Sequence, residues 1–546
     1  MLRKVYFFLL ICLTTLSLEA LDISGMVYYE RIQVHNEKGN SYLDDSNITK
    51  ERAKEVLVEG IDSRGDPVAF TFTDENGSYR LHNINASTNI KIRVSAKMFK
   101  SNRWDLKVID KSNENALYVI EGSEHNTGST DSIRDLTAPL LNQSSAPFAI
   151  LDSIYQAMAK VSKVDPNIAF PSLKIDWSVN NINTGTYYDG EDTIVLQGDQ
   201  KGDSDEFDGH IVIHEWGHFF ENKFSRADNI GGAHGTTEYL DIRVAFGEGF
   251  GNALSAIVTD NPIYFDTFEK SGWNMNIEDE AHQVSGWFSE GSVQRILYDL
   301  YDNNREDHDR LSLGFKPIYE TLIGGHKETP AFTSIFSFID ALKQANPSAT
   351  EEIDAITANE NIASIEESYG IDRLSTLPED ILPLYQTLAV GYPINNLCLN
   401  MNYGIYNKLG NHKYIRFSIK EERDYPIVIQ QSNGEKLDPD FILFKTNPFE
   451  EILTKNSGLA GVEEDTLLLS RGEYLLDISD SSYRKNLCFK LSVGETVEDY
   501  EDNGSSGEKR HSSVGFGLPK NIFLAIIFLL IIIFMPIFFI RKESKL

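Results

Sequence analysis

The chain has 546 residues, which exceeds what one hydrophobic core can support and predicts roughly three or four domains. Its 82 acidic and 50 basic residues give a formal net charge of −32. Such a surface argues against nucleic acid and anionic lipid headgroups as partners, although it says little about a substrate.

The first 20 residues have the layout of a secretory signal peptide. Arg3 and Lys4 precede the apolar stretch 5–13, and Ala20 stands at the expected processing site. We therefore expect the bulk of the chain to be exported from the cytoplasm.

Short runs of alternating apolar and polar residues between 22 and 98 predict a small β-sandwich. The segment 73–77 (TDENG) forms a turn between two of these runs. This order of strands and turn resembles the carboxypeptidase regulatory-like module, a transthyretin-like sandwich. The resemblance implies a spacer or structural appendage without catalysis, and we expect residues 99–144 to be a connector.

Helical periodicity begins near residue 140 and marks a domain at 145–390. We expect a central helix over the apolar run 211–220. A helix at 147–157 and strands at 174–177 and 193–197 are predicted before it. Further helices are predicted after it, at 246–258, 293–301 and 331–342. This order suits a two-lobed α+β domain in which the central helix lies at the floor of a cleft.

The central helix carries the segment HEWGH, residues 214–218. At 3.6 residues per turn, His214 and His218 project from one face of the helix, so both can bind one zinc ion. Glu215 lies beside that ion, where it can take a proton from a water on the zinc. The alternative, a surface helix with two solvated histidines, fits the apolar flanking residues poorly.

A catalytic zinc ion needs a third protein ligand. Glu221 and Phe224 stand where a metzincin has glycine and histidine, which excludes that class. Two glutamates downstream are candidates, Glu248 and, as the alternative, Glu238. We favour Glu248 because its small neighbours allow close helix approach, and because Asn252 one turn later can hydrogen-bond a ligand histidine.

The HEWGH motif followed by GEGFGNALSA, residues 247–256, resembles the gluzincin fold of thermolysin and fungalysin peptidases over about residues 145–375. This resemblance implies one catalytic zinc ion and pairing of a peptide substrate with the edge strand at 185–196. Glu238 has the thermolysin spacing from the motif histidines.

The same resemblance implies a tyrosine and a histidine that donate to the oxyanion of the transition state. Tyr239 stands at the tyrosine position. Trp287 occupies the histidine position, so His282, five residues earlier, is the remaining candidate. We expect His210 and His234 to be solvated loop or helix-end residues.

Residues 393–494 return to short alternating strands and predict a second β-sandwich. The segments 438–441 (DPDF) and 471–474 (RGEY), with the closing pair Cys488 and Phe489, resemble the pre-peptidase C-terminal domain of secreted bacterial proteases. Cys398 and Cys488 both lie in this domain, and in an oxidising compartment they most simply form one disulfide. Two free buried cysteines are the alternative.

The end of the chain predicts a membrane anchor. Residues 495–520 are acidic, then rich in glycine and serine, and predict a flexible stalk. The apolar stretch 521–540 is long enough to cross about 30 Å of hydrocarbon, and the basic residues of 541–546 predict a cytoplasmic tail. A buried soluble helix and a cleaved C-terminal sorting signal are the alternatives.

Together these patterns predict a multidomain protein, with an α+β gluzincin-like peptidase domain flanked by two small β-sandwiches and followed by a transmembrane helix. The predicted function is that of an exported, membrane-anchored zinc metalloendopeptidase that hydrolyses peptide or protein substrates. The alternative is a surface binding or adhesion protein with a vestigial peptidase domain.

Overall fold

The computed structural model describes residues 20–268, 270–278, 284–303, 310–370, 381–432, 438–458, 461–481, 483 and 487–494. The predicted signal sequence up to residue 19, the stalk, the predicted membrane helix, the tail and His282 lie outside these ranges. Within the described ranges, no helix combines the length and the apolar character needed to cross a membrane.

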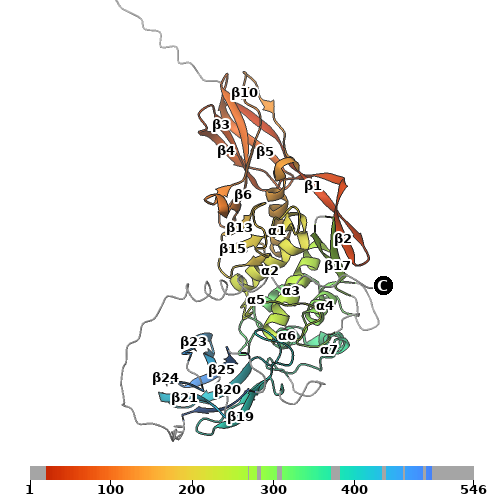
Figure 1. The fold of residues 1–546 in the computed structure, drawn as a ribbon. Helices are drawn as coiled ribbons and strands as arrows, with labels where there is room; N and C mark the ends of the chain where they lie inside the picture. Colours follow the sequence, from red (N-terminus) through yellow and green to blue (C-terminus); the bar gives the residue numbers. More distant parts are fainter. Residues whose placement is uncertain are drawn as a thin grey trace, which may run out of the picture. The chain divides into compact units, whose positions relative to one another are not determined.

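The N-terminal part contains a sheet built around one long strand, β1 (Ala20–Glu37) (Figure 1). Alternate side chains of its first half are buried, as in Ile23, Val27 and Tyr29, because successive residues of a strand face opposite sides. Its neighbours are β2 (Asn40–Arg52), β5 (Ser78–Asn85), β11 (Ser132–Ile133) and β12 (Leu136–Ala138).

A second sheet runs without a break from the N-terminal part into the predicted peptidase domain. Its main path is β14 (Tyr187–Tyr188), β15 (Thr193–Leu196), β13 (Leu173–Trp177), β7 (Trp104–Asp110), β6 (Asn89–Lys100), β3 (Val56–Asp62) and β4 (Pro67–Phe72). The short strands β8 (Ala116–Leu117), β9 (Val119–Glu121) and β10 (His125–Asn126) pair with β6 or β7.

Strand β7 joins the two halves of this sheet although it lies in the predicted connector 99–144. It pairs antiparallel with β6 on one side and parallel with β13 on the other, where Leu106 lies opposite Leu173. The alternation of buried Trp104, Leu106 and Val108 explains why this stretch is a core strand. The predicted N-terminal sandwich is therefore continuous with the peptidase domain.

The predicted peptidase domain is built from α-helices around the central helix α2. They are α1 (Ala146–Val164), α2 (Gly209–Phe224), α3 (Ile242–Thr259), α4 (Glu290–Tyr301), α5 (Phe315–Ile323), α6 (Ile335–Ala345) and α7 (Thr350–Asn359). Helices α5 and α7 were not predicted. The other helices and strands β13 and β15 overlap the predicted segments.

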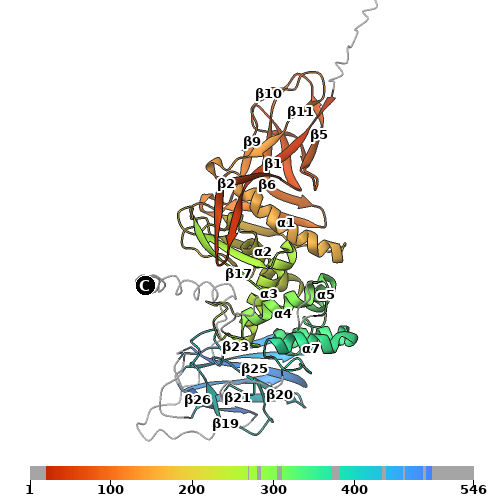
Figure 2. The same ribbon diagram turned by 90° about the vertical axis from the view of Figure 1, so that its right-hand side faces the viewer.

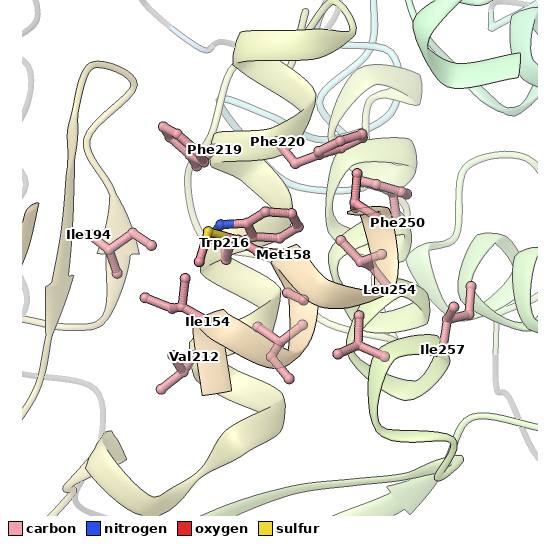
Figure 3. Packing of buried hydrophobic residues seen from close by; sticks show 14 of the residues in the cluster. Ile154, Met158, Ile194, Val212, Trp216, Phe219, Phe220, Phe250, Leu254 and Ile257 are labelled. Atoms are coloured by element: carbon pink, nitrogen blue, oxygen red, sulfur yellow. The ribbon is translucent and has the colours of Figure 1, made fainter. Parts of the chain in front are cut away.

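Helix α2 is buried between α1 and α3 (Figure 3). Trp216 is fully buried and stacks on Phe220, with ring centroids 5.6 Å apart. Met158 of α1 and Leu254 of α3 belong to the same core. Because α2 is packed on most sides, four of its polar residues are buried as well, namely His210, His214, Glu215 and Glu221.

A hairpin that the sequence analysis did not predict follows α3. It consists of β16 (Ile263–Phe268) and β17 (Ser271–Asn276) and lies beside β2 of the N-terminal sheet (Figure 2). The side-chain amide of Asn274 donates to the carbonyls of Glu37 and Asn40, at 2.7 and 2.8 Å. The N-terminal part thus holds one side of this hairpin.

The C-terminal part consists of two antiparallel-rich sheets. One contains β18 (Tyr385–Thr387), β20 (Lys413–Ile419), β25 (Gly472–Asp480), β22 (Pro439–Thr446) and β23 (Phe449–Lys455), and the other β19 (Ile394–Leu399), β26 (Leu487–Val493), β21 (Arg423–Gln431) and β24 (Val462–Leu469). The predicted disulfide is confirmed, because Cys398 and Cys488 are bonded across β19 and β26.

A buried ion-pair cluster joins this C-terminal part to α3. Arg243, in the first turn of α3, contacts Asp241 at 2.9 Å and Asp477 of β25 at 2.7 Å. Asp241 also caps α3 and accepts a hydrogen bond from the Tyr414 hydroxyl at 2.6 Å. All three charged side chains are buried, so the cluster fixes the start of α3.

Arg243→Met should lower the free energy of unfolding by about 3–5 kcal/mol, because the carboxylates of Asp241 and Asp477 would lose their buried counter-ion. Thermal unfolding followed by circular dichroism measures the effect. The control is Arg64→Met, whose exposed side chain pairs with Asp62 and should contribute little. Equal melting temperatures of the two variants would contradict the importance of the cluster.

Candidate metal centre

Three ligand-type atoms from α2 and α3 meet at one point. The Nε2 atoms of His214 and His218 are 3.0 Å apart, and Oε2 of Glu248 lies 3.2 Å and 3.3 Å from them. A tetrahedral zinc ion with bonds of about 2.0–2.1 Å requires ligand atoms roughly 3.3–3.4 Å apart. The arrangement of these two nitrogens and one oxygen therefore fits one zinc ion.

Neighbouring polar groups hold two of these side chains in place. Nδ1 of His214 lies 2.8 Å from Oδ1 of Asn252, whose amide nitrogen donates to Gln294 of α4 at 2.9 Å. Because Asn252 Oδ1 can only accept, Nδ1 carries the proton and Nε2 keeps its lone pair for a metal. Asn229 donates to Oε1 of Glu248 at 2.9 Å, which leaves Oε2 facing the histidines.

The absence of a side chain at Gly251 makes room for His214. A Cβ atom at Gly251 would lie 2.8 Å from Nδ1 and 2.9 Å from Cε1 of His214. The other helix contributes Gly217, whose added Cβ would lie 3.3 Å from the Gly251 Cα. Two glycines that face each other therefore allow the close approach of α2 and α3.

The alternative ligand, Glu238, lies apart from this group. Its carboxylate pairs with Lys408 at 3.3 Å and is 40% exposed. The ligand atoms that lie within 4.8 Å of one another belong to His214, His218 and Glu248, and Glu238 is not among them.

A cavity of about 470 Å³ opens beside the three ligand atoms. Glu215 lines it, as do residues from the loop after α2, from the β16–β17 hairpin and from the first turn of α4. The side chain of Glu215 is largely buried, which suits a carboxylate that must exchange a proton with a reacting group rather than with bulk water.

His234 lies in the loop after α2 and is partly exposed, as expected, but it also contacts the ligand group. Its Nε2 lies 3.3 Å from Oε2 of Glu248, and its Nδ1 lies 2.8 Å from Oε2 of Glu290. Burial lowers the pKa of His234, but the two carboxylates outweigh burial and raise this pKa to about 10. These carboxylates favour the protonated form of His234, which lines the cavity.

Residues 406–408 hold the loop that carries His234. The hydroxyl of Tyr406 donates to the carbonyl of Ile230 at 3.0 Å. The amide of Asn407 donates to the carbonyls of Gly231 and Ala233, at 2.8 and 3.1 Å. A segment from the C-terminal part thus fixes one wall of the cavity.

The other histidine and aromatic candidates occupy different surroundings. Tyr239 packs between Phe288 and Tyr403, at centroid distances of 5.1 and 4.6 Å, and it is not among the described residues that line the cavity. His210 is buried rather than solvated and contacts the carbonyl of Asn261 at 3.2 Å, and burial lowers its pKa to about 4. His282 lies outside the described residues.

The β16–β17 hairpin contributes to the cavity, which was not predicted from the sequence. Four lining residues come from this hairpin, namely Tyr264, Asp266, Trp273 and Met275. The run 263–268 is rich in aromatic residues, as strands often are, but this pattern does not indicate that the strand borders a cavity.

Comparison with known families gives a match that covers the site. A family model described as Mycolysin C-terminal domain matches residues 163–352. The matched stretch contains α2 and α3, and it supports a peptidase-associated family of a kind typical of secreted proteins for this part of the chain. No curated protein matches the chain.

Solved structures resemble this chain only weakly. The pre-peptidase C-terminal domain of a collagenase from Bacillus anthracis is 12% identical, covers 20% of this chain and 93% of its own, and has a TM-score of 0.17. The surface-associated copper-binding protein CorA of Methylomicrobium album BG8 is 9% identical, covers 20% and 98%, and has a TM-score of 0.14. These scores are too low to establish a shared fold.

Gly251→Ala should weaken zinc binding about 10- to 100-fold, because the added methyl group displaces the ring of His214 and disturbs its hydrogen bond to Asn252. Competition with a fluorescent zinc chelator measures the affinity. The control is Gly209→Ala at the start of α2, where a Cβ meets only ordinary contacts at 3.5 Å or more. Unchanged zinc affinity of Gly251→Ala would contradict this packing argument.

Proposed function

We propose that this chain is an exported zinc-dependent endopeptidase. The observation that carries the proposal is the meeting of two imidazole nitrogens and one carboxylate oxygen, 3.0–3.3 Å apart, beside a cavity lined by Glu215. The family match over residues 163–352 supports the same conclusion.

His214, His218 and Glu248 would hold one zinc ion. When bound at such a site, zinc lowers the pKa of a water molecule and polarises the carbonyl of a peptide. Glu215 accepts a proton from the attacking water and returns it to the leaving amine, as a general base and then a general acid.

We assign the oxyanion-stabilising role to His234. The candidates from the sequence were His282 for the histidine and Tyr239 for the tyrosine. Its Nε2 lies beside the ligand group, while Glu290 holds Nδ1. A fixed cationic donor at this place stabilises negative charge that develops on the carbonyl oxygen. Glu290 therefore orients His234 and keeps it protonated.

The edge of the large sheet offers a place for the substrate backbone. Strand β14 is at the end of the sheet path and pairs only on its β15 side among the described strands. Thr186, next to β14, lines the cavity. An extended peptide can add to such an edge by backbone hydrogen bonds, which places its scissile bond near the candidate metal centre.

Export and membrane attachment complete the proposal. They rest on residues 1–20 and 521–540, most of which lie outside the described ranges. Comparing the mass of the full-length protein with that of its cell-surface form distinguishes a retained anchor from a cleaved sorting signal.

Glu215→Gln should reduce the cleavage of casein by about 10²- to 10⁴-fold while zinc binding is retained, because the variant lacks the group that moves the proton. Fluorescent casein measures the rate and elemental mass spectrometry the zinc content. The control is Glu238→Gln, which changes the exposed alternative glutamate and should cleave normally. Wild-type cleavage by zinc-loaded Glu215→Gln would disprove the mechanism, and a wild-type protein purified without zinc would favour the binding-protein alternative.

His234→Gln should lower kcat about 10²- to 10³-fold with little change in KM, because the histidine acts on charge that develops only in the transition state. Steady-state kinetics on a quenched fluorescent peptide separate the two constants. The control is His82→Gln, which changes an exposed histidine of the N-terminal sheet. An increase in KM at constant kcat would instead assign His234 to substrate binding alone.

A further inference from the structure

A second group of acidic side chains lines the cavity beside the candidate metal centre. The carboxylates of Asp203, Asp205 and Asp266 have oxygens within 4.8 Å of one another. They come from the segment before α2 and from β16, which lie side by side through the bridge between Asp203 and Phe268. None of the three forms an ion pair with a lysine or arginine in the part of the chain that the structure describes.

These carboxylates are poorly hydrated and incompletely bonded. Asp205 is buried, and one buried oxygen each of Asp203 and Asp266 has no hydrogen-bond partner among the described residues. Burial, and then repulsion from neighbouring carboxylates, raise the pKa of Asp203 to about 6 and that of Asp266 to about 7. A cation is therefore the ligand that would stabilise their charged forms.

Tyr264 gives an independent indication of a ligand. It lines the same cavity and is only 5% exposed, yet its hydroxyl has no hydrogen-bond partner among the described residues. Because Tyr264 lines the cavity, its hydroxyl is available to a ligand group there. The Tyr264 ring lies 6.3 Å from the ring of His214, which places it on the same side of the cavity as the metal centre.

The aromatic rings of Trp273 and Tyr264 in the cavity wall indicate which kind of cation fits. Trp273 stacks on Tyr264, with ring centroids 5.8 Å apart and an angle of 22°, and remains 38% exposed beside Asp266 in the cavity wall. Metal ions such as Ca²⁺ need oxygen ligands on several sides, whereas carboxylates combined with an aromatic face suit an organic cation. Guanidinium and ammonium groups have this preference.

We propose that Asp203, Asp205 and Asp266, together with Tyr264 and Trp273, bind the side chain of an arginine or lysine of the peptide substrate. This rests on the proposed peptidase function and specifies its substrate class. Thr186, at the edge strand where a peptide would pair, donates a hydrogen bond to Asp205, so a side chain of the paired peptide can reach the carboxylates.

The experiment measures peptide binding to the full chain carrying Glu215→Gln and loaded with zinc, so that no cleavage is needed. In one series of pentapeptides, a single arginine stands at each position in turn and all other residues are uncharged. In a matched series, citrulline, the uncharged analogue of arginine, replaces the arginine. We expect arginine to bind at least about tenfold more tightly than citrulline at one position. Asp203→Asn and Asp266→Asn should each reduce that difference at least about threefold and leave citrulline binding unchanged.

The matched control is Asp192→Asn, which changes a half-exposed carboxylate outside the cavity lining that pairs with Lys174. Equal binding of arginine and citrulline peptides at every position would overturn the proposal. A second bound metal ion that is lost in Asp266→Asn and that blocks arginine peptides would also overturn it. Arginine-selective binding by a wild-type protein that cleaves no peptide would disprove the peptidase function and leave the cation site intact.

Discussion

The close approach of α2 and α3 is the constraint on which the candidate site depends. Gly217 and Gly251 face each other, and a Cβ atom at Gly251 would overlap the ring of His214. Only at this separation can a carboxylate of α3 share a point with two histidines of α2. The aromatic core around Trp216 and the buried pairs of Arg243 hold the two helices in that relation.

Much of this arrangement could be predicted from the sequence, because it depends on local periodicity. The spacing of His214 and His218 follows from the helical repeat, and the small residues around Glu248 indicate close packing. Glu238 lacks such small neighbours, which disfavoured it as the ligand. In the structure it pairs with Lys408. The pairing of Cys398 with Cys488 followed from the small number of cysteines.

What could not be predicted depends on contacts between distant segments. The role of His234 had no local signal, because its partner Glu290 is 56 residues away in the sequence. Only in the folded chain do the two side chains lie 2.8 Å apart. The hairpin with Tyr264 and Trp273 is short and follows a helix directly, so its place in the cavity wall had no local signal. Likewise, the pairing of β7 with β13 across the connector depends on register between strands that no turn joins.

The walls of the cavity are fastened to parts of the chain outside the peptidase helices. Asn274 of the hairpin is bound to the backbone of β1 and β2, and the loop of His234 is bound by Asn407. Because other parts of the chain hold these walls in place, the flanking parts cannot be exchanged freely without disturbing the cavity. In descent, the three parts would have to be inherited together and to vary in step, so recombination at the apparent domain borders would be selected against.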